Sequence, residues 1–294
     1  MKPAPFEYFR PASLDEALSL LAEHGGDAKP LAGGQSLIPA MNFRLATPSV
    51  LVDLNGLGEL SYIKDGSGDV RIGGMTRQRT IERSRLVSDR VPLIAETMPH
   101  IAHPAIRNRG TIGGSLAHAD PAAELPAVML ALKARLMVSS RTSGTREVPA
   151  DEFFVGVFST AVQPGELLTE IRIPPARTRS GFAFQEISRR HGDFALVGVA
   201  AVVELDEQGH CAEARIALLS VGDRPMRAAQ AGKVLAGQQP SVEAIRAAAD
   251  AAATQDIDPS SDIHASARYR RQLANVLTRR VLERAFERAT LKRD

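Results

Sequence analysis

The chain has a single cysteine, Cys211, among its 294 residues. One thiol cannot form an intrachain disulfide, and it cannot ligate an iron–sulfur cluster, which is held by several cysteine thiolates. We expect Cys211 to be a buried strand residue. The seven histidines never fall into a ligand spacing such as H-E-x-x-H, so the sequence predicts no metal site.

Aromatic residues are scarce as well, at 4% of the chain with no tryptophan, and the net charge is only +2. This composition disfavours a nucleic-acid-binding surface built on base stacking. No stretch approaches the roughly 18 apolar residues of a membrane span, and the start, Met-Lys-Pro-Ala-Pro-Phe, lacks the apolar segment of a secretion signal. We expect a cytoplasmic protein, with a length and a hydrophobic share of 44% that suffice for two domains.

Two glycine-centred stretches stand out against this background, Leu31-Ala-Gly-Gly-Gln-Ser-Leu37 and Thr111-Ile-Gly-Gly-Ser-Leu116. A Gly-Gly pair can adopt positive φ and lets a phosphate approach successive backbone N–H groups. The flanking serine and threonine hydroxyls add donors. Neither G-x-G-x-x-G nor a P-loop motif occurs in the chain, which disfavours the usual nucleotide-binding folds. One Gly-Gly pair is more often an ordinary turn, but two with flanking hydroxyls predict a dinucleotide held from two sides.

The first part of the chain reads as mixed helix and strand. Ser13-Leu-Asp-Glu16 is a capping box, and it begins a helix that Gly25-Gly26 ends. The patterns predict strands at 29–32, 50–54 and 135–139, a hairpin within 55–74, helices at 80–84, 91–98 and 124–132, and loops at both glycine stretches. A polar, proline-bearing linker at 174–181 closes an expected domain of residues 1–175, with subdomains of about 1–55 and 56–175.

The rest, residues 176–294, is expected to form a second domain. Strands at 182–188, 195–205 and 211–219 would make an antiparallel sheet, covered by helices at 228–236, 241–254 and 267–289. The last helix has an apolar stripe, and on its polar side lie six arginines, Arg270, Arg271, Arg279, Arg280, Arg284 and Arg288. A solvated face is the favoured interpretation of these arginines, and docking to an acidic partner subunit is the alternative.

Three segments give the chain a family resemblance. They are Ala32-Gly-Gly-Gln-Ser36, Thr111-Ile-Gly-Gly-Ser115 with its extension His118 to Pro126, and Arg189-Arg-His-Gly-Asp-Phe-Ala195. Together they resemble the medium, FAD-binding subunit of the carbon monoxide dehydrogenase and xanthine dehydrogenase (molybdenum hydroxylase) family. The resemblance spans nearly the whole chain and includes Tyr269-Arg-Arg-Gln-Leu273 near the end.

The resemblance implies an α+β fold. It consists of a vanillyl-alcohol-oxidase-like FAD-binding domain of two subdomains, followed by a C-terminal three-stranded antiparallel sheet with a helical bundle. It also implies FAD in this chain, two [2Fe-2S] clusters in a small partner subunit and a molybdenum pterin cofactor in a large one. The expected assembly is a dimer of heterotrimers.

Carried onto this sequence, the resemblance implies a set of pyrophosphate-binding residues that act through backbone N–H groups and hydroxyls. They are Ala32, Gly33, Gly34, Gln35, Ser36, Leu37, Thr111, Ile112, Gly113, Gly114 and Ser115. Glu124, where relatives often have aspartate, would contact the cofactor further along, although it is equally well a first-turn acid at a helix N-terminus. Ile101 and Leu168 match apolar positions that line the flavin, and core packing alone would also explain them.

Gln185 stands where some relatives have a lysine near the flavin, which leaves a charge-tuning role open. Asp193 and Phe194 complete the implied cofactor-binding set. Relatives often have tyrosine at the position of Phe194; phenylalanine keeps a surface that can stack on the isoalloxazine but loses the hydroxyl. The alternative for Phe194 is a core aromatic at the start of a strand.

The sequence thus predicts a flavoprotein oxidoreductase subunit of a molybdenum hydroxylase, with no catalytic acid–base residues of its own. It would take electrons from the partner's [2Fe-2S] clusters and pass them to an external acceptor, because the flavin does the chemistry. One alternative is a free-standing FAD-dependent dehydrogenase or oxidase, which would need a substrate-capping domain. Another is a non-catalytic adaptor, which the intact glycines disfavour. The substrate and the final acceptor, whether quinone, cytochrome, oxygen or NAD, are not identified.

Overall fold

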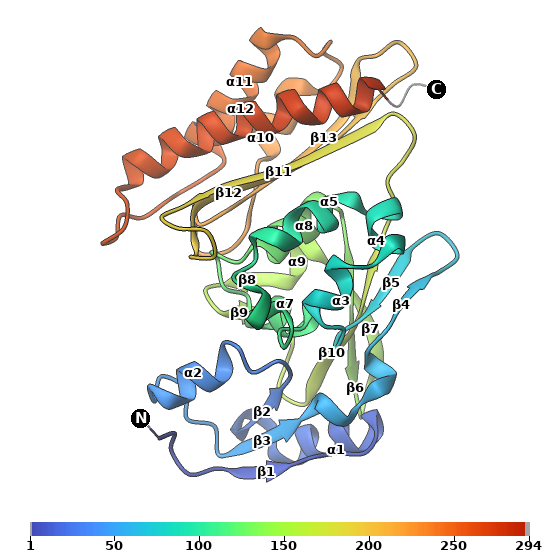
Figure 1. Cartoon of the computed structure of the whole chain (residues 1–294), viewed down its shortest axis with the longest axis vertical. Coiled ribbons are helices and arrows are strands. Elements are labelled where there is room, and N and C mark those ends of the chain that lie inside the picture. Colours follow the sequence, from blue (N-terminus) through green and yellow to red (C-terminus); the bar gives the residue numbers. More distant parts are fainter. Residues whose placement is uncertain (1, 292–294) are drawn as a thin grey trace.

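The computed structural model describes residues 2–291, which form three stacked layers (Figure 1). The N-terminal layer holds a small parallel sheet, the middle layer a five-stranded sheet with short helices, and the C-terminal layer a second antiparallel sheet under three helices. The mixed α+β architecture expected from the sequence is confirmed.

The N-terminal layer contains the sheet β1-β3-β2, with β1 at Glu7–Phe9, β2 at Ala28–Leu31 and β3 at Val50–Asp53. The predicted capping box begins α1 (Leu14–His24), where the Ser13 hydroxyl accepts a hydrogen bond from the Glu16 N–H. Its apolar face is buried. After β2 the chain forms α2 (Leu37–Asn42), so the first glycine stretch connects a strand to a helix.

The middle layer is built on the sheet β4-β5-β10-β6-β7. Its strands are β4 (Ile63–Asp65), β5 (Val70–Gly73), β10 (Glu166–Ile173), β6 (Arg135–Ser140) and β7 (Gly144–Pro149), all paired antiparallel. The helices lie on one side of this sheet (Figure 1). They are α3 (Gln78–Glu82), α4 (Arg85–Arg90), α5 (Pro92–Thr97), α6 (Pro104–Arg107), α7 (Ile112–His118), α8 (Glu124–Ala131) and α9 (Ala150–Phe153), with a 3-10 turn, η4 (Met98–His100), and a hairpin of β8 (Phe154–Gly156) and β9 (Ser159–Thr160).

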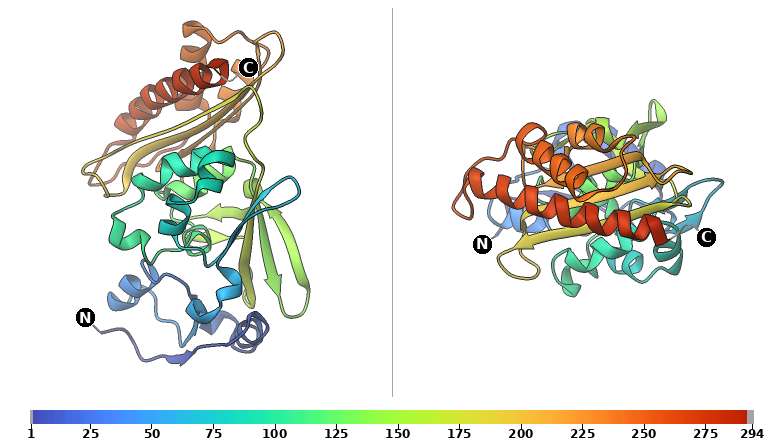
Figure 2. Two further views of the ribbon diagram at one scale, coloured as in Figure 1. Left: turned by 45° about the vertical axis from the view of Figure 1, so that its right-hand side comes forward. Right: turned by 90° about the horizontal axis from the view of Figure 1, so that it is seen from above.

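The C-terminal layer has the three expected long strands, β11 (Ser180–Ser188), β12 (Ala195–Leu205) and β13 (Cys211–Leu219), and a two-residue fourth strand, β14 (Met226–Arg227). The helices α10 (Ala229–Leu235), α11 (Val242–Gln255) and α12 (Ala267–Leu291) cover its outer face (Figure 2). Its inner face packs on α5 and α8 of the middle layer. Cys211 is buried in β13, as expected.

The structure corrects several expectations. The second glycine stretch is not a loop, because Thr111 caps α7 and the two glycines lie inside that helix. The strands β7 and β10 and the helix α4 were not expected. The solvated-face interpretation is wrong for Arg270, which is 7% exposed and donates to the Leu196 carbonyl. Across residues 2–291, no helix has the length and hydropathy needed to cross a membrane.

Candidate cofactor site

The first glycine stretch connects β2 to α2, and its two glycines are needed for different reasons. Gly34 has a φ of +73°, a region that residues with a Cβ adopt at a cost. Gly33 has no positive φ, but a Cβ there would lie 2.5 Å from the Arg109 carbonyl oxygen. The stretch therefore packs directly on the chain that leads into the second glycine stretch.

The second glycine stretch packs against the first. A Cβ on Gly114 would lie 3.4 Å from the Ala32 Cβ, and one on Gly113 would collide with the backbone of Gly74. These glycines have negative φ and allow close packing of chain segments, not a left-handed turn. The two stretches that the sequence singled out are thus brought together.

The second stretch does not offer the expected backbone donors. The N–H groups of residues 112–115 donate to Thr76, Gly74, Thr111 Oγ1 and Thr111 in turn, at 2.9 to 3.1 Å. Ile112 is fully buried in the core. Thr111 is 2% exposed and its hydroxyl oxygen caps α7, so the partly exposed Ser115 hydroxyl is the side-chain group of this stretch that is open to an anion. Ser36 and Leu37 lie at the start of α2.

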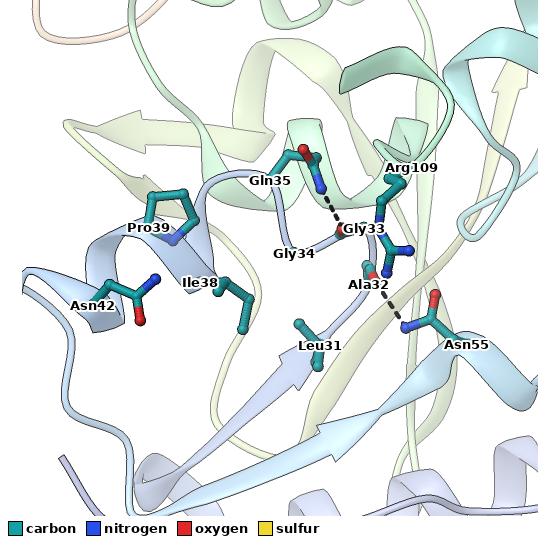
Figure 3. A pocket seen from close by; sticks show the side chains of 10 residues that line it. All are labelled: Leu31, Ala32, Gly33, Gly34, Gln35, Ile38, Pro39, Asn42, Asn55 and Arg109. Atoms are coloured by element: carbon teal, nitrogen blue, oxygen red, sulfur yellow. Dashed lines mark hydrogen bonds between the residues drawn. The ribbon is translucent and has the colours of Figure 1, made fainter. Parts of the chain in front are cut away.

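A cleft of about 460 Å³ opens beside the first stretch (Figure 3). Its lining includes Ala32 to Gln35, which were predicted, and six residues that were not: Leu31, Ile38, Pro39, Asn42, Asn55 and Arg109. Arg109 comes two residues before Thr111. A basic residue next to a glycine motif was therefore the signal in the sequence that could have identified Arg109 as a cleft residue. Ile38 and Pro39 provide an apolar wall, and Asn42, Asn55 and Arg109 provide polar groups.

A hydrogen-bond network fixes the inner wall of this cleft. Asn55 donates to the Ala32 carbonyl at 3.0 Å and accepts from Arg77 at 2.6 Å. Arg77 also donates to the Arg109 carbonyl. Burial, followed by repulsion from Arg109, lowers the pKa of Arg77, so two guanidinium groups lie close together at this edge. The positive charge of these two groups attracts an anion to this edge of the cleft.

Asp53 is the acid behind this network. Burial alone would raise its pKa, but hydrogen bonds from Tyr8 and Asn55 outweigh that effect and hold the pKa below its usual value. Its carboxylate is therefore committed to Tyr8 and Asn55 and orients the Asn55 amide. The cleft combines glycine backbone, amides and the Arg109 guanidinium, a donor set that fits a pyrophosphate, and its volume lies in the range of cofactor pockets.

Of the residues expected at the flavin end, Glu124 and Phe194 lie where the middle layer faces the C-terminal sheet, whereas Leu168 lies on β10 beside Gly74. Ile101 and Leu168 are 7% and 5% exposed and belong to the middle core. Glu124 is buried in the first turn of α8, where burial and the charge of Glu186 raise its pKa to about 8. Phe194 is 69% exposed, which excludes a core aromatic and leaves its ring available for stacking.

The side chains of β11 alternate between the two faces of its sheet. A Cβ on Gly181 would collide with α12, whereas Glu186 lies 3.5 Å from His100 of the middle layer. By this alternation Gln185 lies on the α12 side, and its neighbour Glu186 faces the site. Asp193 is paired with Arg189 at 3.5 Å within the turn after β11.

The segment that carries Ile101 is held in a strained shape. Ala102 has a φ of +45°, which is unusual for a residue with a Cβ. The buried Arg107 donates to the carbonyls of Ile101 and Ala102 at 2.8 and 3.2 Å, and Glu82 holds its guanidinium in turn. Gly192, with a φ of +89°, packs against the His103 ring. The turn after β11 therefore packs directly on the segment around Ala102 and His103.

These features define an α+β subunit with a glycine-lined cleft that bears a cation, and comparisons with known proteins identify its family. The model of the FAD binding domain in molybdopterin dehydrogenase matches residues 4–176, and that of the CO dehydrogenase flavoprotein C-terminal domain matches residues 182–285. The chain belongs to this family: it is a medium, FAD-binding subunit of a molybdenum-hydroxylase-type dehydrogenase. No group of three or more His, Cys, Asp and Glu side chains suited to a metal occurs between residues 2 and 291.

The relatives match over nearly their full length. The chain is 46% identical to the alpha subunit of the 6-hydroxypseudooxynicotine dehydrogenase complex of Paenarthrobacter nicotinovorans, covering 98% of this chain and 97% of that protein. It is 42% identical to the carbon monoxide dehydrogenase medium chain of Afipia carboxidovorans, with coverage of 98% and 99%. A solved structure of carbon monoxide dehydrogenase from Hydrogenophaga pseudoflava superposes with a TM-score of 0.95 at 40% identity, with coverage of 98% and 99%.

Proposed function

We propose that this chain binds FAD with its pyrophosphate in the cleft beside the first glycine stretch, and that it relays electrons within a molybdenum-containing dehydrogenase complex. Electrons come from [2Fe-2S] clusters of a small partner subunit, and they leave to an external acceptor. A large partner subunit carries the molybdenum pterin cofactor and oxidises the substrate. The flavin supplies the redox chemistry, and the chain supplies its position and its electrostatic surroundings.

The observation that carries the proposal is the contact between the two glycine stretches at the edge of a cleft lined by Arg109, with Arg77 close behind it. In the proposal, Gly33 to Ser36 and the Ser115 hydroxyl surround the pyrophosphate, Thr111 fixes the start of α7 beside it, and Arg109 balances its charge. Ile38 and Pro39 form the apolar wall beside it. Ile101 and Phe194 lie toward the flavin ring.

The experiment is the release of cofactor from the purified chain. Denaturation of the yellow protein should release FAD into the supernatant, because no covalent link is proposed, and chromatography would identify it. Recovery of FMN, or flavin that stays with the precipitated chain, would contradict the proposal. So would a folded chain that binds no flavin when FAD is added.

A further inference from the structure

Two buried carboxyl groups lie where the middle layer meets the C-terminal sheet. Glu124 begins α8 and is 7% exposed, and the Glu186 side chain on β11 is 6% exposed. The charge of Glu186 contributes to the raised pKa of Glu124, so the two carboxyls are close enough to interact. At neutral pH Glu124 therefore holds a proton.

The Glu186 carboxyl is incompletely partnered. Its Oε2 atom is buried and has no hydrogen-bond partner among residues 2–291. Its Oε1 atom lies 3.5 Å from His100 Nδ1, which is long for a hydrogen bond. A buried polar atom without a partner is rare in folded proteins and calls for a functional explanation. This oxygen is free to accept a proton.

His100 connects the pair to solvent. Its side chain is 35% exposed, and its ring packs edge-on against the buried Phe184, with centroids 5.1 Å apart. The charged and titratable groups on the surrounding elements include Glu96 on α5 with Arg284 and Arg288 on α12, Asp120 before α8, His103 after η4, and Arg189, Arg190, His191 and Asp193 after β11. Of these, Arg284, Arg288 and Arg189 are paired with acids other than Glu186.

We propose that Glu186 and Glu124 form a proton-uptake site coupled to reduction of the flavin, with His100 as its entrance. The inference rests on the proposed function, because it needs FAD reduced beside this pair. Two electrons from the partner subunit and one proton leave the reduced flavin with a negative charge. That charge favours the neutral form of a nearby carboxyl. A second proton from solvent therefore binds the Glu186 carboxylate, and the pair then holds two protons.

The test is the midpoint potential of the bound FAD, measured by dye equilibration from about pH 6.5 to about pH 7.5, below the pKa of about 8 of Glu124, so that Glu124 keeps its proton in the oxidised chain. Each proton taken up with two electrons changes the potential by about 30 mV per pH unit. The unaltered chain should take up about two protons per two electrons, and Glu186→Gln about one. Glu213→Gln is the matched control. Glu213 lies on β13 and also bridges to the middle layer, through Lys133 at 2.5 Å, yet it should leave the count at two.

A count of one proton in the unaltered chain would overturn the inference, as would equal counts in the unaltered chain and Glu186→Gln. If Glu186→Gln does not retain flavin, the reduced-minus-oxidised infrared spectrum of the unaltered chain decides. A new band from a protonated carboxyl supports the proposal, and its absence overturns it. Failure of the unaltered chain to bind FAD would instead contradict the proposed function.

Discussion

At the residue scale, the glycines of the two stretches are required for different structural reasons, although the sequence shows two similar Gly-Gly pairs. Gly34 is needed for its backbone conformation, and Gly33 and Gly113 are needed because another backbone passes where their side chains would be. A side chain at Gly33 would therefore push the first glycine stretch away from Arg109, and a side chain at Gly113 would push α7 away from Gly74. Substitution at Gly34 changes mainly the local shape of the cleft.

Gly34→Val should abolish FAD retention while the chain stays folded. The positive φ costs a β-branched residue about 1–3 kcal/mol, and the new side chain enters the cleft. Gly237→Val is the matched control, because Gly237 has a φ of +74° at the end of α10 with open space around it. Both variants should lose similar stability in urea, but only Gly34→Val should lose flavin absorbance. Full flavin occupancy in Gly34→Val would refute the pyrophosphate assignment.

Glu124 should give the flavin-free chain a specific pH dependence. Its folded-state pKa of about 8 lies above the ordinary value of 4.5, so between these values the folded chain holds a proton that the unfolded chain lacks. The free energy of unfolding should therefore fall as pH rises through this window, by at most about 1.4 kcal/mol per pH unit from this group.

Glu124→Gln removes that titration. Urea unfolding from about pH 5 to about pH 8 should show the variant gaining stability relative to the unaltered chain as pH rises. A constant difference between the two across this range would show that Glu124 is ionised in the folded chain.

At the scale of elements, local signals in the sequence predicted most of the fold. The Ser13 capping box, the three long C-terminal strands and the buried stripe of α12 all appear where the patterns indicated. The helix α7 was missed because Ile112-Gly-Gly-Ser115 has two poor helix formers. Its position is set by the Thr111 cap and by packing of Gly113 on Gly74, a contact distant in sequence.

Two further misses have the same tertiary origin. The strand β10 pairs with β5 and β6, each distant in sequence, so no adjacent turn marks it. The roles of Arg109 and Asn55 in the cleft depend on the meeting of segments near residues 33, 55 and 110. A basic residue beside a glycine motif is a hint of such a role, but the network with Arg77 is visible only in three dimensions.

Arg288 on α12 should contribute to stability far more than its position on a polar helix face suggests. It donates to Glu96 at 2.5 Å and to the Phe182 carbonyl at 2.6 Å, which fastens α12 and β11 to α5. Arg288→Met should lower the free energy of unfolding by about 1.5–3 kcal/mol, as for hydrogen bonds to charged groups.

Arg279→Met provides the comparison on the same helix. Arg279 has a weak contact of 3.9 Å with Glu283 on the same exposed face, so its loss should cost less than about 1 kcal/mol. Urea unfolding would measure both variants. Equal costs would mean that the Glu96 contact does not stabilise the packing of the C-terminal layer.

At the scale of the whole molecule, the three layers place the pyrophosphate cleft and the expected flavin end on different elements. The cleft is lined by residues of the first two layers, whereas Glu186 on β11 and Phe194 just before β12 belong to the C-terminal layer. The turn after β11 packs on His103 and so joins the C-terminal layer to the middle layer. A cofactor that spans them would hold all three layers together, so FAD should raise the unfolding temperature of the entire chain.

Substrate turnover should require the partner subunits. The only thiol, Cys211, is 1% exposed, and burial raises its pKa to about 12, so the chain has no set of thiolates to hold an electron-donating cluster. The purified chain with FAD should therefore reduce only artificial dyes when given a reductant.

Addition of the small and large partner subunits should restore reduction of its flavin by the substrate of the complex, followed as bleaching of the flavin absorbance. The small subunit alone should let a chemical reductant of its clusters reduce the flavin, but not the substrate. Rapid reduction of the flavin by an organic substrate in the isolated chain would refute the relay and favour a free-standing flavoenzyme.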